Sequence, residues 1–148
     1  MIPEGKMREI AETLLQRTKE GRVRWKENPP FRDVLHAWYL LSLGDSAIQL
    51  GYSSPSADPD TKVKYPDEVT FDVEDSTGKR VGRLYAEEVD EDQTNWKLLL
   101  SLVSEVRRAV TNWDKVLESV ERALKAPGVI GDFPDSPPTE SKEGGAKQ

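Results

Sequence analysis

The stretch HAWYLLSLGDSAIQLGYS, residues 36–53, decides the fold class of this chain. Tyr39, Leu41 and Leu43 share one face of 36–43, and Ile48, Leu50 and Tyr52 recur at every second position of 46–52. A period of two is typical of strands with one buried face. Gly44 and Asp45 separate the two runs, and two residues are the length of a tight hairpin turn. The stretch therefore predicts two antiparallel strands joined by a two-residue turn.

Further strands are predicted on both sides of this hairpin. Residues 69–85 contain a second hairpin with a turn at 76–78, and Gly82 interrupts the alternation in a way that indicates a β-bulge. Upstream, RVRWKE at 22–27 alternates basic with apolar residues. Because Trp25 points away from the basic side chains, we interpret the basic face as solvated rather than as a nucleic-acid site. The pattern predicts five strands in an antiparallel meander.

Helical periodicity is found on both sides of the predicted sheet. Residues 5–20 place apolar side chains three and four positions apart and end at Gly21, a residue that suits a helix C-terminus. A second apolar stripe, over 94–125, consists of Trp96, Leu99, Val103, Val106, Val110, Trp113, Leu117, Val120 and Leu124. The expected fold class is α+β: an antiparallel sheet of about five strands flanked by an N-terminal helix and a long C-terminal helix.

The long helix raises a geometric difficulty. An unbroken helix over 94–125 would be about 46 Å long, whereas a seven-residue strand spans about 23 Å. The distal apolar residues therefore need cover beyond the sheet. Three arrangements would supply it: the N-terminal helix covers them, the helix breaks at Thr111-Asn112 with Asn112 capping a second helix, or another protein chain, identical or different, binds them.

Composition predicts one domain and a tail. Residues 1–126 are expected to form a single α+β domain. Residues 127–148, PGVIGDFPDSPPTESKEGGAKQ, are expected to form a disordered tail, because they cannot bury enough apolar surface to offset the entropy of ordering. The apolar share of the whole chain is 36%, and such a segment accounts for this low value.

The charge distribution bears on partners and location. The net charge is −6, and five carboxylates are concentrated at Glu87, Glu88, Asp90, Glu91 and Asp92. Proteins whose main role is to bind nucleic acid present basic surfaces, so nucleic acid is not the expected partner. The chain has no cysteine and no apolar run of about 18 residues, which favours a cytoplasmic protein that binds no membrane.

The residues available for catalysis are few. His36 is the only histidine, so the chain has no histidine-rich metal site. Because it has no cysteine, it has no Cys–His dyad either. The acidic stretches 72–78 and 87–92 lack the ligand spacing of a calcium-binding loop. No glycine-rich phosphate loop or dinucleotide fingerprint is present. We therefore expect no catalytic residues, no metal and no cofactor.

The order of these signals resembles a group of small uncharacterised bacterial proteins. The segments that carry the resemblance are LLQRTKEGRVRW at 14–25, FDVEDSTGKRVGRLY at 71–85 and LLLSLVSEVRRAV at 98–110. The resemblance implies a helix–antiparallel sheet–helix organisation and a bacterial or phage origin. It implies no activity and no site residues.

The predicted function is that of a non-catalytic protein-interaction or accessory module, such as an immunity, antitoxin or defence-associated factor. A protein partner, or a second copy in a homodimer, would bind the distal part of the long helix, and a basic partner would also bind the acidic segment. The predicted partner-binding residues are Trp113, Leu117, Val120, Leu124, Glu87, Glu88, Asp90, Glu91 and Asp92. The alternative is a nucleotide- or metabolite-sensing domain with a pocket lined by Trp25, Trp38, Tyr39 and Tyr52.

Overall fold

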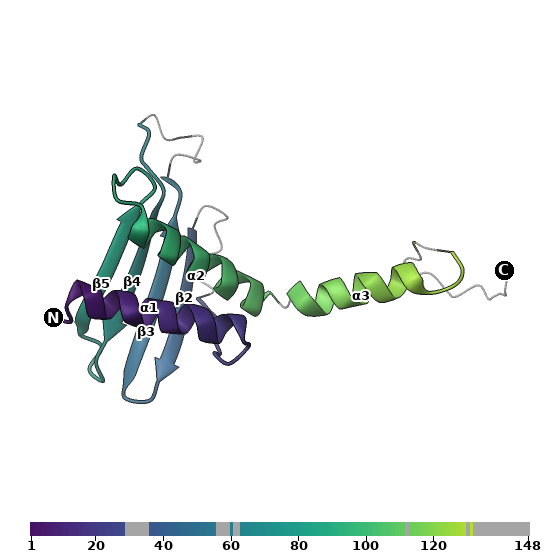
Figure 1. Ribbon diagram of the computed structural model, residues 1–148, viewed down its shortest axis with the longest axis horizontal. Helices are drawn as coiled ribbons and strands as arrows, with labels where there is room; N and C mark the ends of the chain where they lie inside the picture. Colours follow the sequence, from purple (N-terminus) through teal and green to yellow (C-terminus); the bar gives the residue numbers. More distant parts are fainter. Residues whose placement is uncertain (29–35, 56–59, 61–62, 112, 130, 132–148) are drawn as a thin grey trace. The chain divides into compact units, whose positions relative to one another are not determined.

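The computed structural model describes residues 1–28, 36–55, 60, 63–111, 113–129 and 131 (Figure 1). The chain divides into two units, Met1–Asn112 and Trp113–Gln148. Most of the predicted disordered tail lies outside the described residues. Within the described ranges, no helix has the length and apolar character needed to cross a membrane.

The first unit contains a five-stranded sheet whose strands follow the order of the chain. The strands are β1 (Lys26–Glu27), β2 (His36–Leu43), β3 (Ser46–Ser53), β4 (Glu68–Glu74) and β5 (Arg80–Glu87). All neighbouring strands are antiparallel, so the predicted α+β meander is confirmed. Gly44 in the turn between β2 and β3 has a φ of 71°, a conformation that favours glycine.

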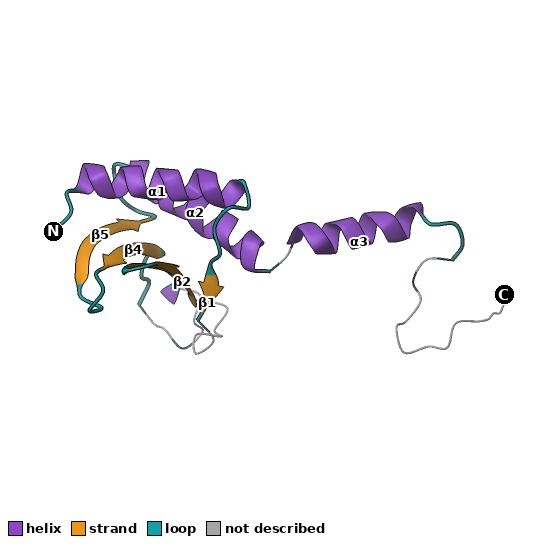
Figure 2. Ribbon diagram, turned by 90° about the horizontal axis from the view of Figure 1, so that it is seen from below, coloured by secondary structure: helices purple, strands orange, loops and turns teal. Residues whose placement is uncertain are grey.

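Two helices, α1 (Glu4–Lys19) and α2 (Thr94–Val110), lie side by side on one face of the curved sheet (Figure 2). The core forms between this face and the helices. Four residues of the core are aligned across β2, β3, β4 and β5 and are at most 2% exposed: Tyr39, Leu50, Phe71 and Leu84. The helices contribute Met7, Ala11, Leu99, Leu102 and Val106. We call this the helix-covered face of the sheet, and the opposite one the outer face.

The first strand is much shorter than predicted. The alternation indicated a strand over 22–27, but β1 has two residues. The preceding segment is held by α1 instead, because the Arg22 amide donates a hydrogen bond to the Arg17 carbonyl at 2.9 Å. Trp25 is buried, and its Nε1 donates to Oγ1 of Thr18 at 3.0 Å. These contacts with α1 replace the pairing with β2 that an extended segment would make.

The predicted β-bulge is confirmed in β5. Gly82 pairs with Val73 and Arg80 pairs with Glu74, so Val81 is an extra residue without a partner on β4. An extra residue bends a strand and increases its local twist.

Gly82 also allows α1 to approach the sheet closely. A Cβ atom added at Gly82 would lie 2.5 Å from Sδ of Met7 and 3.1 Å from Cβ of Ile2. The Ile2 amide donates to the carbonyl of the bulged Val81 at 2.7 Å. The bulge and the lack of a side chain at Gly82 together leave the space in which Ile2 and Met7 pack against β5.

The apolar stripe over 94–125 is carried by two helices, α2 and α3 (Trp113–Lys125). The sequence left open whether 94–125 forms one helix or two, and the structure has two: α2 ends at Val110 and α3 begins at Trp113. The Thr111 hydroxyl donates to the Arg107 carbonyl at 2.7 Å, and such back-bonding by threonine bends helices. Asn112, the predicted cap of the second helix, lies outside the described residues.

Candidate functional site

Helix α3 carries an apolar stripe whose described members are exposed. Val116, Leu117, Val120 and Leu124 are 60%, 55%, 49% and 60% exposed, and we call these four residues the α3 stripe. They recur at the spacing that places side chains on one side of a helix. Trp113, the predicted anchor, begins α3, but its side chain lies outside the described part of the chain. The other predicted residues of the helix are thus exposed, as a docking surface requires.

The charged residues of α3 are distributed unequally around the stripe. Among the charged side chains that the structure describes, at 100° per residue, Glu121 lies nearest the stripe, Lys125 follows it, and Glu118, Lys115 and Arg122 lie on the opposite side of the helix. Arg122 forms an ion pair with Glu118 at 3.7 Å, with both side chains more than 70% exposed, and such a pair contributes little to stability. Glu121 is therefore the charged side chain that borders the stripe most closely.

The acidic segment 87–92 is a connector in which most carboxylates bind the chain itself. Oδ2 of Asp90 accepts a hydrogen bond from the Glu87 amide at 2.9 Å. Oε1 of Glu88 accepts one from the Asp67 amide at 3.1 Å. These bonds fix the turn between β5 and α2, so the side chains have a structural role that the sequence pattern did not indicate.

Asp92 has a role at the start of α2. Its Oδ1 accepts from the Thr94 hydroxyl at 2.6 Å and from the Thr94 amide at 3.0 Å. The hydroxyl, followed by the amide, lowers the pKa of Asp92, and a carboxylate there complements the positive end of the helix. Of the five carboxylates, only Glu91 has no hydrogen bond or ion pair within the described residues, and its side chain is exposed. The segment offers a basic partner less free negative charge than its composition suggests.

The four aromatic residues of the predicted ligand pocket do not share one surface. Trp25 and Tyr39 are 8% and 1% exposed and belong to the core. Tyr52 also lies on the helix-covered face, where its hydroxyl donates to Oδ2 of Asp67 at 2.6 Å. Burial and this carboxylate raise the pKa of Tyr52 to about 12, so the hydroxyl stays protonated. Trp38, by contrast, lies on the outer face.

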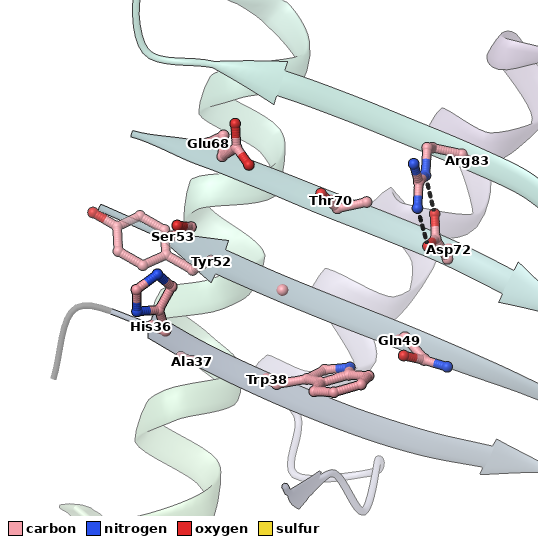
Figure 3. Close-up of a pocket in the computed structure, with 11 residues that line it drawn as sticks. His36, Ala37, Trp38, Gln49, Tyr52, Ser53, Glu68, Thr70, Asp72 and Arg83 are labelled. Atoms are coloured by element: carbon pink, nitrogen blue, oxygen red, sulfur yellow. Dashed lines mark hydrogen bonds and ion pairs between the residues drawn. The ribbon is translucent and has the colours of Figure 1, made fainter. Parts of the chain in front are cut away.

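The outer face holds a hollow of about 300 Å³ that the sequence did not reveal (Figure 3). Trp38, Gly51 and Thr70 are aligned across β2, β3 and β4. Because Gly51 has no side chain, the centre of this row is open: a Cβ atom built there meets no atom within 4 Å. We call the space the Gly51 hollow. The sequence did contain one sign of this space: Gly51 and Trp38 fall on the same face of two neighbouring predicted strands, opposite to the apolar face.

Polar side chains line the Gly51 hollow on both sides of this row (Figure 3). On one side, Arg83 donates two hydrogen bonds to Asp72, at 2.7 and 2.8 Å. On the other, Glu68 accepts a hydrogen bond from the Tyr85 hydroxyl at 2.8 Å and forms no ion pair within the described residues. His36, Gln49 and Ser53 also belong to the lining.

The described part of the chain contains no group of three or more His, Cys, Asp or Glu side chains that could hold a metal ion. Comparisons of the chain with protein-family models, with curated proteins and with solved structures found no match. Function must therefore be inferred from the exposed surfaces of the two units.

Proposed function

We propose that this protein is a non-catalytic protein-interaction module that docks onto its partner through the α3 stripe. The observation that supports this most directly is the exposure of four large apolar side chains along one side of a single helix. Burial of one such side chain contributes about 1.5–3 kcal/mol. A partner that covers the stripe would therefore gain a large part of the free energy that stable association requires.

The length of α3 supports the same proposal. The helix has 13 residues, and isolated helices shorter than about 12–15 residues are marginal in water. All described side chains from 115 to 129 are exposed. A partner would supply the packing that a helix of this length needs.

The partner that fits is a different protein with an apolar groove and a basic residue beside it. Amphipathic helices bind grooves through anchors near positions i, i+3 and i+7, a spacing that Leu117, Val120 and Leu124 have. The basic residue would complement Glu121, which borders the stripe. Pairing with α3 of a second copy is less suitable, because 13 residues are fewer than two heptads and coiled coils are recognised over three to four.

A small acidic module that docks by one helix would serve as an immunity, antitoxin or defence-associated factor of a bacterium or phage. The resemblance to small bacterial proteins with helix–sheet–helix organisation supports this setting. The absence of cysteine suits the reducing cytoplasm, which is where we place the protein. Catalysis is not part of the proposal.

Val120→Asp should weaken binding to the partner at least tenfold, because it places a charge in the middle of the apolar contact. Cross-linking through a photoreactive residue at position 121 would identify the partner, and calorimetry with the two purified proteins would give the dissociation constant. Ser119→Asp is the matched control, because it introduces the same charge one position away, about 100° round the helix and outside the α3 stripe. We expect the Ser119 variant to bind like the wild type.

Light scattering during size exclusion separates this proposal from self-association. We expect the isolated chain to be a monomer at all concentrations. A dimer that Val120→Asp dissociates and Ser119→Asp does not would assign the α3 stripe to a second copy and overturn the choice of a different protein. Equal affinities of the two variants for the purified partner would exclude the α3 stripe as the docking surface.

A further inference from the structure

We infer that α3 folds on docking: in the free chain residues 113–125 exchange between helix and coil, and the partner binds the helical form. The inference rests on the proposed docking through the α3 stripe and adds what sets the affinity of that surface. Val116, Val120 and Leu124 share one side of the segment only while its backbone is helical. The docking surface is therefore present in only a fraction of the free molecules.

The packing of α3 differs from that of the other two helices. Four residues of α1 and five of α2 are buried, whereas every described side chain of α3, from 115 to 125, is exposed. Most of the stability of a helix in a protein comes from the packing of its apolar face. The core supplies that packing to α1 and α2, and α3 has none of it within the described residues.

The length of α3 is limited at both ends. On one side α2 ends at Val110, so α3 does not continue an existing helix. On the other side Pro127 follows closely, and proline disfavours the helical conformation of the residue before it. Gly128 has a φ of 110°, which lies outside the helical range. The 13 residues of α3 are a length at which isolated helices are marginal in water.

Interactions within α3 compensate little for this short length. The ion pair between Arg122 and Glu118 spans 3.7 Å, and both side chains are more than 70% exposed, so water screens it. Val116 and Val120 are β-branched and lose side-chain freedom in a helix. Burial would offset that loss, and a partner that covers the stripe is what buries them. Docking and folding of α3 are therefore coupled.

This coupling makes the affinity depend on the helix population of the free chain. The apparent dissociation constant equals the intrinsic one divided by the fraction of molecules in the competent form. A substitution that changes helix propensity outside the stripe should therefore change the affinity without changing the contacts with the partner. Ser119 suits this purpose, because it is exposed and lies in the middle of α3 outside the stripe.

The Cα chemical shifts of the free full-length chain measure its helicity residue by residue. We expect the helical shifts of residues 115–125 to be below about half of those in α1, which serves as the internal reference for a fully formed helix. A saturating amount of the partner identified by cross-linking should raise them to the values of α1. Shifts in the free chain as large as those of α1 would overturn the inference.

Two substitutions of Ser119 test the link between helicity and affinity. Ser119→Ala should bind more tightly than the wild type and Ser119→Gly more weakly. Their dissociation constants should differ about fivefold, because alanine favours a helix much more than glycine does. The helical shifts of the free variants should change in the same order. Equal affinities of the two variants for the purified partner would contradict folding on docking.

The same two substitutions at Ser104 are the matched control. Ser104 is exposed within α2, a helix that the core holds in place, so Ser104→Ala and Ser104→Gly should bind the partner equally. A fivefold difference between these two variants would show that the effect at Ser119 does not come from folding of α3.

The shifts of the free chain need no partner, so folding on docking and the docking proposal can fail separately. Full helical shifts in the free chain, together with weakened binding by Val120→Asp, would overturn folding on docking and keep the α3 stripe as the docking surface. Equal affinities of Val120→Asp and Ser119→Asp would overturn both.

Discussion

Trp25→Ala should lower the free energy of unfolding by about 3–5 kcal/mol, the usual cost of removing a buried aromatic side chain. The indole is 8% exposed and fills the space between α1 and the start of the sheet. A domain of this size has a total stability of about 5–15 kcal/mol, so the loss should be visible as a large shift of the urea midpoint. A change below about 0.5 kcal/mol, typical of surface positions, would contradict the placement of Trp25 in the core.

Two conservative variants separate the volume of this side chain from its hydrogen bond. Trp25→Phe keeps most of the aromatic volume but leaves the hydroxyl of Thr18, which is 6% exposed, without its donor. An unsatisfied buried polar group costs about 1–3 kcal/mol. Combining Trp25→Phe with Thr18→Val removes both polar groups, so the double variant should regain part of that loss. Failure of the double variant to recover any stability would show that the hydrogen bond is not the cause.

Gly82→Val should destabilise the fold by about 1–3 kcal/mol, because it overpacks a site that has no free space. Its Cβ would lie 2.5 Å from Sδ of Met7, and Met7 is completely buried, so its side chain cannot move into solvent. Chemical denaturation monitored by circular dichroism measures the loss.

Gly51→Val is the matched control for Gly82→Val, because both glycines lie in strands and neither has a positive φ. The Gly51 variant should be as stable as the wild type or more stable, since valine favours strands and the added Cβ has open space. Equal destabilisation by both substitutions would mean that backbone propensity, and not close packing against α1, explains the requirement at Gly82.

Patterns that depend on neighbours in the chain were predictable. The hairpin at 36–53 has its strands within a residue of the expected limits, because alternation and turn length specify register together. The bulge at Gly82 was predictable for a similar reason, since a glycine that interrupts alternation needs a local explanation. The helix over 5–20 was recognisable from its apolar face and the glycine that follows it.

The sequence pattern was insufficient where a specific hydrogen bond competed with it. Residues 22–27 do alternate, but Trp25 buries its side chain against α1, and the segment forms a strand of only two residues. The stripe over 94–125 keeps its period through Thr111, yet the hydroxyl of Thr111 bonds to the Arg107 carbonyl and the helix ends there. Periodicity reports which side of an element is apolar, and it is insensitive to such hydrogen bonds.

The candidate sites were predictable to different degrees. The α3 stripe follows directly from helical spacing, so its residues could be named from the sequence. The Gly51 hollow requires the register of three strands, which brings Trp38, Gly51 and Thr70 into one row. Residues of an acidic run such as 87–92 look alike in a sequence, and only the folded turn distinguishes those that bind backbone amides from Glu91.

The bulge in β5 has a consequence for the behaviour of the protein at high concentration. A long flat strand at the margin of a sheet can recruit a strand from another molecule and start aggregation. In β5 the extra residue interrupts the ladder, the Val81 carbonyl is already bonded to Ile2, and charged Arg80, Arg83 and Glu87 lie along the strand. Incoming chains would find few backbone groups in register, so this margin is protected against amyloid-like growth.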